Sequence, residues 1–417
     1  MTKKKTVIIG GGPAGLMAAI SAANVGSSVT LIEKNRSLGK KLLLTGNRRC
    51  NFANTADIDI FISKFGKNGR FLRNAWTSLA ASDIVEFFET RGLRCKVESS
   101  GRIFPLDDRS SSVLEILEKE LKTLHVQILK GSPAAELTCR NNRISGVILS
   151  DGNYIPCGNI ILATGGVSYP STGSSGDGFK FSRDLGHKIV PLRPGLVPLI
   201  AEGNCLETLM SLSLYGVSLK IFHGDRSIKT EKGDIIFTDR GLSGPLILSV
   251  SGTISSFLEK KEKVSIGINI FPDITSEKMN DMLSEYIKNH PAKSMKHFFR
   301  GMIPCRLRDL LLFLSISPAD KKAGLVTRRE KFLLNSLCKD LRFSIKGTYP
   351  MREAMITMGG IHLREVDPHT MSSKIITGLY FAGEILDIAG DSGGFNLQAA
   401  LSTGHLAGKS AGSAKNS

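Results

Sequence analysis

Short apolar runs without polar interruption alternate with helix-forming stretches over the first part of the chain. Val7 to Ile9 form such a run, which is typical of a parallel strand buried on both faces. Pro13 to Val25 form an alanine-rich stretch that predicts a helix, and a second apolar run ends at Glu33. The order strand, glycine-rich turn, helix and strand predicts an α/β fold with a parallel sheet.

The rest of the first half contains further predicted elements. Helical spacing predicts amphipathic helices, and short β-rich runs predict a small antiparallel addition. The helices are expected near residues 71–91 and 111–123, and the added strands at 126–129, 135–139 and 144–149. Asn159 to Leu162 form another buried strand that leads to Thr164-Gly165-Gly166, and we expect it beside the first strand.

A different pattern begins near residue 190. β-like segments separated by glycines and charged turns predict a barrel-like or sandwich insertion, with strands at 196–200, 217–222, 234–238 and 264–270. Helical spacing, as in Met279, Leu283 and Ile287, then predicts a small helical insertion. The closing segment returns to the first fold with a strand near Phe381 and a final helix that begins at Gly394–Asn396.

These changes of pattern predict three domains. A dinucleotide-binding domain covers residues 1–189 and 356–417, a β-barrel-like domain covers 190–274 and 341–355, and a helical domain covers 275–340. The length agrees with this division, since 417 residues exceed what one hydrophobic core usually supports.

The glycine-rich turn carries the first chemical signal. Gly10 permits the tight turn, Gly12 lets the backbone approach a pyrophosphate, and Gly15 lets helix and strand pack closely. The N-terminus of the helix at Pro13 favours the phosphates, and Glu33 would hold the ribose hydroxyls. The sequence therefore predicts an adenine dinucleotide site.

Two further strand ends narrow the prediction to FAD. Ala163-Thr164-Gly165 and Tyr380-Phe381-Ala382-Gly383-Glu384, taken with the first motif, resemble the glutathione-reductase-like flavin fold. A plain NAD dehydrogenase needs only the first motif. Glu384 stands where that fold usually has Asp, and the resemblance implies that this acid lies against the ribityl and pyrophosphate groups.

Several loops make the resemblance narrower. They are Thr45–Asn51, Gly165–Gly178, Phe237–Pro245, Gly383–Gly390 and Gly393–Asn396. These loops resemble the signatures of a bacterial family of FAD/NAD(P)-dependent oxidoreductases that includes aminoacetone oxidase and the bile-acid-pathway flavin reductase. The family has an FAD domain interrupted by a β-barrel-like and a helical domain. The chain departs from its pattern at Arg48, where the family usually has Gly, and at Asp239, where it often has His.

The resemblance and the dinucleotide motif together imply a set of cofactor contacts. The expected FAD-binding residues are Gly10, Gly12, Pro13, Ala14, Gly15, Glu33, Lys34, Lys40, Thr45, Gly46, Asn51, Ala134, Ala163, Thr164, Gly165, Gly383, Glu384, Asp387, Gly394, Phe395 and Asn396. Arg49 is a further candidate by the same analogy. We expect Cys50 to be a packed small residue and His187 to be structural, and we assign no catalytic acid or base and no metal site.

Charge and cysteine content limit the partners. The formal net charge is +17, with 13 Lys and Arg against 3 Asp and Glu in residues 1–75, and 14 against 7 in residues 275–345. No nucleic-acid recognition motif accompanies this charge, so we expect a small-molecule substrate and anionic cofactors rather than nucleic acid. Seven cysteines without paired spacing, and the absence of an apolar stretch near 18 to 20 residues, predict a cytoplasmic protein without membrane insertion. The oligomeric state is not predicted.

The sequence thus predicts an FAD-dependent oxidoreductase. Hydride would pass through flavin N5 between a small organic substrate or NAD(P)H and an acceptor, either oxygen or an unsaturated compound. No second dinucleotide unit is evident, so NAD(P)H would dock transiently. The alternatives are a basic flavoprotein that binds nucleic acid and modifies tRNA, and an FAD-binding scaffold without catalysis.

Overall fold

A computed structural model describes residues 5–203 and 206–414 of the chain. The chain divides into two compact units. The first unit combines residues Met1–Gly195 and Met351–Ser417, and the second consists of Leu196–Pro350. The barrel and the helices inserted into it share one hydrophobic core and form one unit. The division of the chain into three domains stays a prediction.

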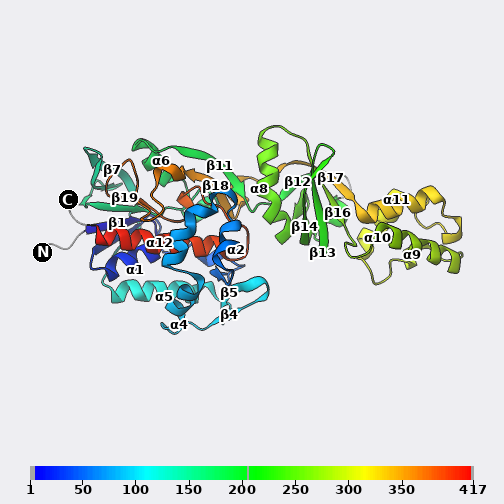
Figure 1. Ribbon diagram of the computed structural model, residues 1–417, viewed down its shortest axis with the longest axis horizontal. Coiled ribbons are helices and arrows are strands. Elements are labelled where there is room, and N and C mark those ends of the chain that lie inside the picture. Colours follow the sequence, from blue (N-terminus) through cyan, green and yellow to red (C-terminus); the bar gives the residue numbers. More distant parts are fainter. Residues whose placement is uncertain (1–4, 204–205, 415–417) are drawn as a thin grey trace. The chain divides into compact units, whose positions relative to one another are not determined.

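A five-stranded parallel sheet forms the centre of the first unit (Figure 1). Its strands, in spatial order, are β19 (Leu379–Phe381), β10 (Asn159–Leu162), β1 (Lys5–Ile9), β2 (Ser28–Glu33) and β6 (Gln127–Lys130). The prediction that β10 lies beside β1 is confirmed, with Ile8 opposite Ile161 in parallel register. Val7 and Ile8 are buried, because helices and loops cover both faces of such a sheet.

One predicted strand belongs to a different sheet from the expected one. Residues 126–129 were expected in the antiparallel addition, but β6 pairs in parallel with β2 and forms an edge of the main sheet. Only the two segments after it, with one short strand more, make the antiparallel sheet: β7 (Ala134–Arg140), β8 (Arg143–Leu149) and β9 (Tyr154–Pro156). A strand of four residues is too short for its apolar pattern to indicate whether it pairs in the parallel or in the antiparallel sheet.

Two helices pack closely against each other in the first unit. Figure 1 shows α1 (Pro13–Asn24, blue) beside α12 (Phe395–Ser413, red). Glycines on α12 allow this approach, since a Cβ atom added at Gly404 would lie 2.3 Å from the Ala14 carbonyl oxygen, and one at Gly408 would lie 2.2 Å from that of Ala18. The predicted start of the last helix is confirmed.

The remaining elements of the first unit surround this core. The helices are α2 (Ile58–Ser63), α3 (Arg73–Ser78), α4 (Ala81–Glu89), α5 (Ser110–Thr123) and α6 (Asp177–Asp184). The strands are β3 (Ala53–Asn54), β4 (Cys95–Val97) and β5 (Arg102–Pro105) in one small sheet, and β11 (Ile189–Gly195) and β18 (Ile356–Ile361) in another. Helices were predicted near 71–91 and 111–123, and α3, α4 and α5 confirm them.

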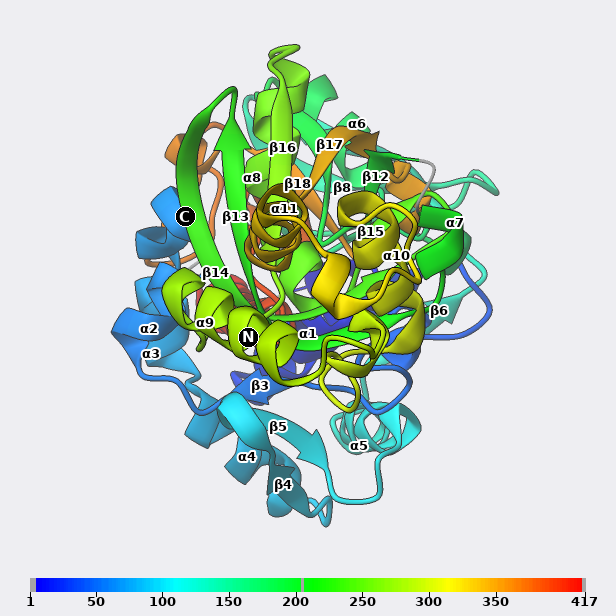
Figure 2. The same ribbon diagram turned by 90° about the vertical axis from the view of Figure 1, so that its right-hand side faces the viewer.

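The second unit is a closed antiparallel barrel with helices attached (Figures 1 and 2). Its strands, in order around the barrel, are β12 (Leu199–Glu202), β15 (Gly241–Ser243), β14 (Arg226–Phe237), β13 (Ser213–His223), β16 (Val264–Asn269) and β17 (Leu341–Thr348). The helices are α7 (Leu206–Leu209), α8 (Pro245–Glu259), α9 (Ser276–Asn289), α10 (Cys305–Ser315) and α11 (Arg328–Lys339). The barrel prediction is confirmed, whereas α8, β15 and β17 had no sequence prediction.

Candidate functional site

A cleft opens at the carboxyl ends of the parallel strands in the first unit, which is where α/β sheets place their ligands. It contains about 1340 Å³ of space, with its open mouth included. The three segments with nucleotide-like motifs all line it, at Gly10–Ala14, Ala163–Gly165 and Ala382–Glu384. Segments separated by more than two hundred residues in sequence therefore surround one space.

The start of α1 provides backbone donors without a competing side chain. Gly12 has no atom within 4 Å of an added Cβ, so the backbone faces open space here. Gly10 has φ +112° and its added Cβ would lie 2.4 Å from the Ala163 carbonyl oxygen, which requires glycine. No side chain caps the helix, and Pro13 occupies its first turn. The N–H groups and the helix dipole are therefore available to a phosphate.

Glu33 is fixed at the end of β2 by three donors. Its carboxylate accepts the Gly11 N–H at 2.7 Å, the Asn35 N–H at 2.8 Å and the Asn35 side-chain amide at 2.7 Å. The carboxylate is largely buried and lines the cleft. An acceptor held in this position suits a pair of ribose hydroxyls.

Polar partners already hold the lysines that line the cleft. Lys34 pairs with Asp177 at 2.7 Å, and Lys40 donates to the Asn35 side-chain oxygen at 3.1 Å. Lys41 forms an ion pair with Glu384 at 2.7 Å. These lysines therefore hold the walls of the cleft in position, and the start of α1 supplies the donors that are free for an anion.

Glu384 has several partners besides Lys41. Its carboxylate accepts the Thr357 N–H at 2.6 Å and the Ser168 hydroxyl at 3.1 Å, while Lys41 also donates to the Ser168 hydroxyl at 2.6 Å. Glu384 thus joins the ends of β10, β18 and β19 and still lines the cleft. Its partners, Lys41, Ser168 and Thr357, come from three separate segments, and spacing in sequence could not reveal them.

The Thr45–Asn51 loop connects to the start of α12. In the orientation that its neighbours require, the Asn51 amide donates to the Ala53 and Ile103 carbonyl oxygens at 3.0 and 3.1 Å and accepts the Gly394 N–H at 3.0 Å. The Asn396 side-chain oxygen accepts the Gly390 N–H, and the Asn396 NH₂ group donates to the Gly390 carbonyl oxygen, both at 2.8 Å. These two side chains position the helix start.

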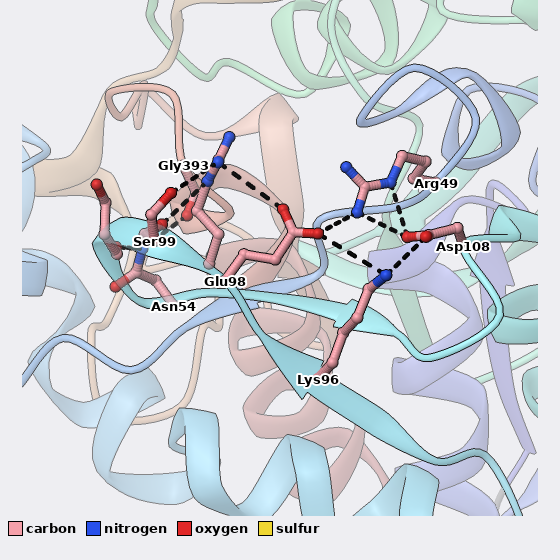
Figure 3. A network of polar contacts seen from close by, with 9 residues as sticks. Arg49, Asn54, Lys96, Glu98, Ser99, Asp108 and Gly393 are labelled. Atoms are coloured by element: carbon pink, nitrogen blue, oxygen red, sulfur yellow. Dashed lines mark hydrogen bonds and ion pairs between the residues drawn. The ribbon is translucent and has the colours of Figure 1, made fainter.

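Arg49 belongs to a polar network beside this loop, and Figure 3 shows the network from close by. Its guanidinium contacts Glu98, and its Nε donates to Asp108 at 2.7 Å. Lys96 forms an ion pair with Asp108 at 2.6 Å, and the Arg49 guanidinium also lies over the Phe104 ring. The ion pairs hold the pKa values of Glu98 and Asp108 below their usual range. Arg49 thus fixes the loop through these contacts.

The expected cofactor residues fall into two groups. Those that line the cleft are Gly10, Gly12, Pro13, Ala14, Glu33, Lys34, Lys40, Thr45, Ala134, Ala163, Thr164, Gly165, Gly383, Glu384 and Asn396. Those that do not line it are Gly15, Gly46, Asn51, Asp387, Gly394 and Phe395. Gly15 supports the cleft from behind, since an added Cβ would lie 1.9 Å from the Gly10 carbonyl oxygen.

Asp387 is one of the expected residues that lies outside the cleft lining. Its carboxylate accepts the Asn68 amide at 3.0 Å, and burial raises its pKa above the usual value. Its neighbour Ile388 lines the cleft instead.

Other lining residues were missed by sequence analysis. Gly11, Asn35, Ser37, Gly39, Lys41 and Leu42 follow the predicted strands directly, so their proximity to the motif could have suggested them. The apolar residues Phe65, Met355, Ile356, Ile388 and Leu397 had no chemical signature. Planar aromatic ligands need such apolar walls.

One buried polar atom lies on the cleft wall without a partner among the described residues. The Thr164 hydroxyl is inaccessible to solvent and has no hydrogen bond there. The hydroxyl faces Gly178, where an added Cβ would lie 2.1 Å from it, and does not face the open cleft. The glycine cradle, the fixed Glu33 carboxylate and the apolar wall together fit a dinucleotide with an aromatic ring system.

Cys50 and His187 have structural surroundings. Cys50 is fully buried, and burial raises its pKa to about 12, so it is a neutral thiol at ordinary pH. His187 is buried with its ring nitrogens near Glu365 at 3.2 Å and Ser373 at 2.9 Å. Both findings agree with the roles expected from sequence. Within residues 5–203 and 206–414, no cluster of three metal-ligating side chains occurs.

The family comparison covers nearly the whole chain. Residues 4–410 match the family described as the HI0933-like protein Rossmann domain. The chain belongs to this family. The resemblance inferred from the loops is thereby confirmed.

Proteins similar to this HI0933-like chain match it from end to end. The 3-dehydro-bile acid delta(4,6)-reductase of Clostridium scindens is 31% identical over 407 residues, which is 97% of this chain and 98% of that protein. The ribosomal RNA dihydrouridine synthase of Escherichia coli K12 is 31% identical over 404 residues, which is 97% of this chain and 96% of that protein.

Solved structures show the same fold at much lower identity. A 3-ketosteroid-delta4-(5alpha)-dehydrogenase from Rhodococcus jostii RHA1 has a TM-score of 0.54 at 13% identity and covers 99% of this chain and 98% of its own. A flavocytochrome c3 fumarate reductase has a TM-score of 0.51 at 18% identity, with coverage of 98% and 78%. These two structures share the fold of the HI0933-like chain. Its family and its reductase relative support a flavin-dependent oxidoreductase with FAD as the cofactor. Among the described residues, no helix has the length and apolar character that a membrane crossing requires.

Proposed function

We propose that the chain catalyses the reduction, by NAD(P)H, of a carbon–carbon double bond conjugated with a carbonyl group, and that its cleft would hold FAD for this reaction. The observation that carries the proposal is the single cleft shared by the ends of β1, β2, β10 and β19. When bound, FAD supplies the hydride carrier of this reaction. The names of the two relatives, a delta(4,6)-reductase and a dihydrouridine synthase, both describe saturation of a double bond.

The side chains of the cleft would hold and orient the cofactor. We assign the ribose hydroxyls to Glu33 and the pyrophosphate to the backbone N–H groups of Gly12, Ala14 and Gly15. Glu384, fixed by Lys41, supplies an acceptor for the ribityl hydroxyls. Phe65 and the other apolar lining residues exclude water from the ring system, which protects a hydride from solvent.

The overall reaction balances without a further redox partner. The hydride adds to the carbon β to the carbonyl, and a proton adds to the α carbon. The double bond gains two electrons, and the nicotinamide loses two. NAD(P)H docks transiently, because the sequence contains no second strand–GxGxxG–helix unit.

Anaerobic stopped-flow spectroscopy of the yellow protein tests the reaction. We expect NADH or NADPH to bleach the flavin absorbance, and an α,β-unsaturated ketone such as a 4-en-3-one steroid or a uridine-containing RNA to restore it without oxygen. Restoration by oxygen alone, with both unsaturated compounds inert, would indicate an oxidase and contradict the proposal. Flavin that no nicotinamide reduces would contradict it as well and would favour the scaffold alternative.

The charge of the chain favours RNA as the source of the double bond. The net charge is +17, and the relative that acts on ribosomal RNA matches 97% of this chain. Uracil contains a double bond conjugated with a ring carbonyl, so the same hydride chemistry applies to it. This second candidate replaces the tRNA alternative with RNA in general.

Mass spectrometry of RNA digests tests this candidate. Ribosomal RNA incubated with the protein and NADPH should gain two hydrogen atoms per modified uridine. Free steroid enone should then be a poor substrate by comparison. A measured kcat/KM for the enone above that for RNA would reject RNA as the substrate.

A further inference from the structure

The helices inserted into the barrel expose large apolar side chains in a basic segment. Phe313 on α10 is 74% exposed and Phe332 on α11 is 67% exposed, although both belong to helices with well-buried inner faces. Leu325, just before α11, is 64% exposed. Figure 1 shows α9, α10 and α11 on one side of the barrel and α8 on the other. Single exposed apolar side chains are common on protein surfaces, so it is their combination with unpaired cations on α11 that indicates a binding surface.

The segment that contains these aromatic residues is rich in lysine and arginine. Residues 293–331 contain ten Lys and Arg against three Asp and Glu. Two of the three acids already have partners, since Asp309 pairs with Arg308 at 2.9 Å and Glu330 with Lys321 at 3.0 Å. Within the described part of the chain, Arg328 and Arg329 have no carboxylate partner. Both side chains are exposed and leave their charge unneutralised.

The geometry of α11 brings charge and ring together. Arg328 and Phe332 are four residues apart, as are Arg329 and Leu333, so each pair lies on the same side of the helix. The opposite side, which contains Leu334 and Cys338, packs into the core. The outer side therefore alternates cationic and apolar side chains along one helix.

We propose that the outer side of α11, formed by Arg328, Arg329, Phe332 and Leu333, binds single-stranded or looped RNA, with Phe313 of the neighbouring α10 as a further aromatic side chain. Unpaired bases stack on exposed aromatic rings, while arginines contact the phosphates and can stack on bases. A membrane would require a continuous apolar side, which the arginines of α11 interrupt. The inference rests on the second candidate function, in which RNA is the substrate, and it adds the place where RNA is held.

Fluorescence anisotropy with the full-length, FAD-loaded protein tests the surface. The probe is a fluorescein-labelled RNA stem–loop with a uridine-rich loop, titrated at several salt concentrations. For R328Q/R329Q we expect at least a tenfold loss of affinity at 100 mM salt. The slope of log K against log salt should become about 1.4 less steep, since each lost phosphate contact on a single strand accounts for about 0.7.

A second variant separates stacking from charge. F313A/F332A should lose about fivefold or more in affinity, within the range expected for one stacked base, with the salt slope unchanged. The matched control is K260Q/K261Q, which removes two exposed cations at the end of α8 in the same unit. An equal loss in this control, or unchanged binding in both surface variants, would overturn the proposal.

Two additional measurements distinguish this proposal from the function on which it rests. Vesicles with anionic lipid are offered to the wild type, and binding to them without binding to RNA would overturn the RNA assignment. Dihydrouridine formation is measured in parallel with each variant. RNA reduction at the wild-type rate by both surface variants would refute the surface and leave the proposed function intact. RNA binding that depends on the surface, without reduction, would refute the RNA substrate and leave the surface intact.

Discussion

At the scale of single residues, the cleft depends on side chains that several hydrogen bonds hold in place. The Glu33 carboxylate meets the Gly11 and Asn35 N–H groups at 2.7 and 2.8 Å. A carboxylate can accept from several donors at once because it has two equivalent oxygens. An amide in the same position would direct its NH₂ group toward one of these N–H donors.

We therefore expect Glu33→Gln to weaken FAD binding while the protein still folds. Loss of a charge-assisted hydrogen bond costs about 1.5–3 kcal/mol, which corresponds to roughly 10- to 100-fold in the FAD dissociation constant. Fluorescence titration of the apoprotein with FAD measures this constant. The exposed Glu115→Gln on α5 is the control and should bind FAD as the wild type does. Equal affinity in Glu33→Gln would remove this residue from the cofactor site.

His187 gives a prediction about pH. Burial lowers its pKa below the usual 6.5, and this effect exceeds the opposing influence of Glu365. The folded protein then holds the ring neutral, whereas the unfolded chain takes up a proton once the pH falls below about 6.5. The free energy of unfolding should therefore fall as the pH decreases from 7.5 to 5.5, by at most about 1.4 kcal/mol per pH unit from this group.

Chemical denaturation at pH 7.5 and 5.5 measures this contribution. His187→Gln should lose less stability between the two pH values than the wild type does. His125→Gln, which alters an exposed ring, should keep the wild-type difference. A larger loss in His187→Gln would mean that the ring is protonated in the folded state through Glu365.

Some site residues could be predicted from sequence, and others could not. Gly10, Gly12 and Glu33 follow from a local motif in which backbone geometry dictates the residue type. Lys41 and Ser168 meet Glu384 only because distant segments converge. The spacing of residues in the sequence does not indicate which distant segments come into contact, so these contacts could not be predicted from it.

At the scale of elements, glycine decides how closely helices approach. Gly408 lies inside α12, where alanine would ordinarily stabilise the helix by about 1 kcal/mol. The added methyl group would lie 2.2 Å from the Ala18 carbonyl oxygen on α1, so packing opposes helix propensity. Overpacking of this kind typically costs 1–3 kcal/mol.

Gly408→Ala should therefore lower the free energy of unfolding, with a net loss of up to about 2 kcal/mol. Urea denaturation followed by circular dichroism measures it. Ser413→Ala, at an exposed position of the same helix, should stay within about 0.5 kcal/mol of the wild type. A stabilised Gly408→Ala would show that the two helices can move apart at little cost.

Elements with a clear period were predictable, and elements without one were not. Val7–Ile9 in β1 and Ile160–Leu162 in β10 are uninterrupted apolar runs, and α5 has a regular apolar stripe. The α8 segment is rich in β-branched and serine residues, which favour no single period, and its helix forms through burial of Leu246 and Ile247 against the barrel. Tertiary packing here outweighed local propensity.

At the scale of the whole molecule, the chain leaves its first fold and returns to it. The sheet takes β19 from a segment more than two hundred residues after β10, and the insertion between them forms its own closed barrel. The return was predictable because the Tyr380–Glu384 strand end repeats the chemistry of the first strand ends. Closure of the barrel was not, because β15 has three residues and gives no periodic signal.

Separate hydrophobic cores in the two units predict separate unfolding transitions. Ile161 is fully buried in the core of the first unit and Ile266 in that of the second. Each isoleucine-to-alanine change should lower the free energy of unfolding of its own unit by about 2–5 kcal/mol, and with it the melting temperature of that unit. Differential scanning calorimetry of the two variants therefore assigns the two transitions.

The cofactor should then act on one transition. All residues that line the cleft belong to the first unit, so FAD binds its folded form and stabilises it by mass action, by about 2.7 kcal/mol when free FAD is at 100 times its dissociation constant. We expect added FAD to raise the melting temperature of the transition that Ile161→Ala lowers. The melting temperature of the transition that Ile266→Ala lowers should stay unchanged. A single transition that FAD moves as a whole would show that the barrel unit cannot remain folded without the first. The insertion would then be part of the cooperative unit that holds the cofactor, although none of its residues line the cleft.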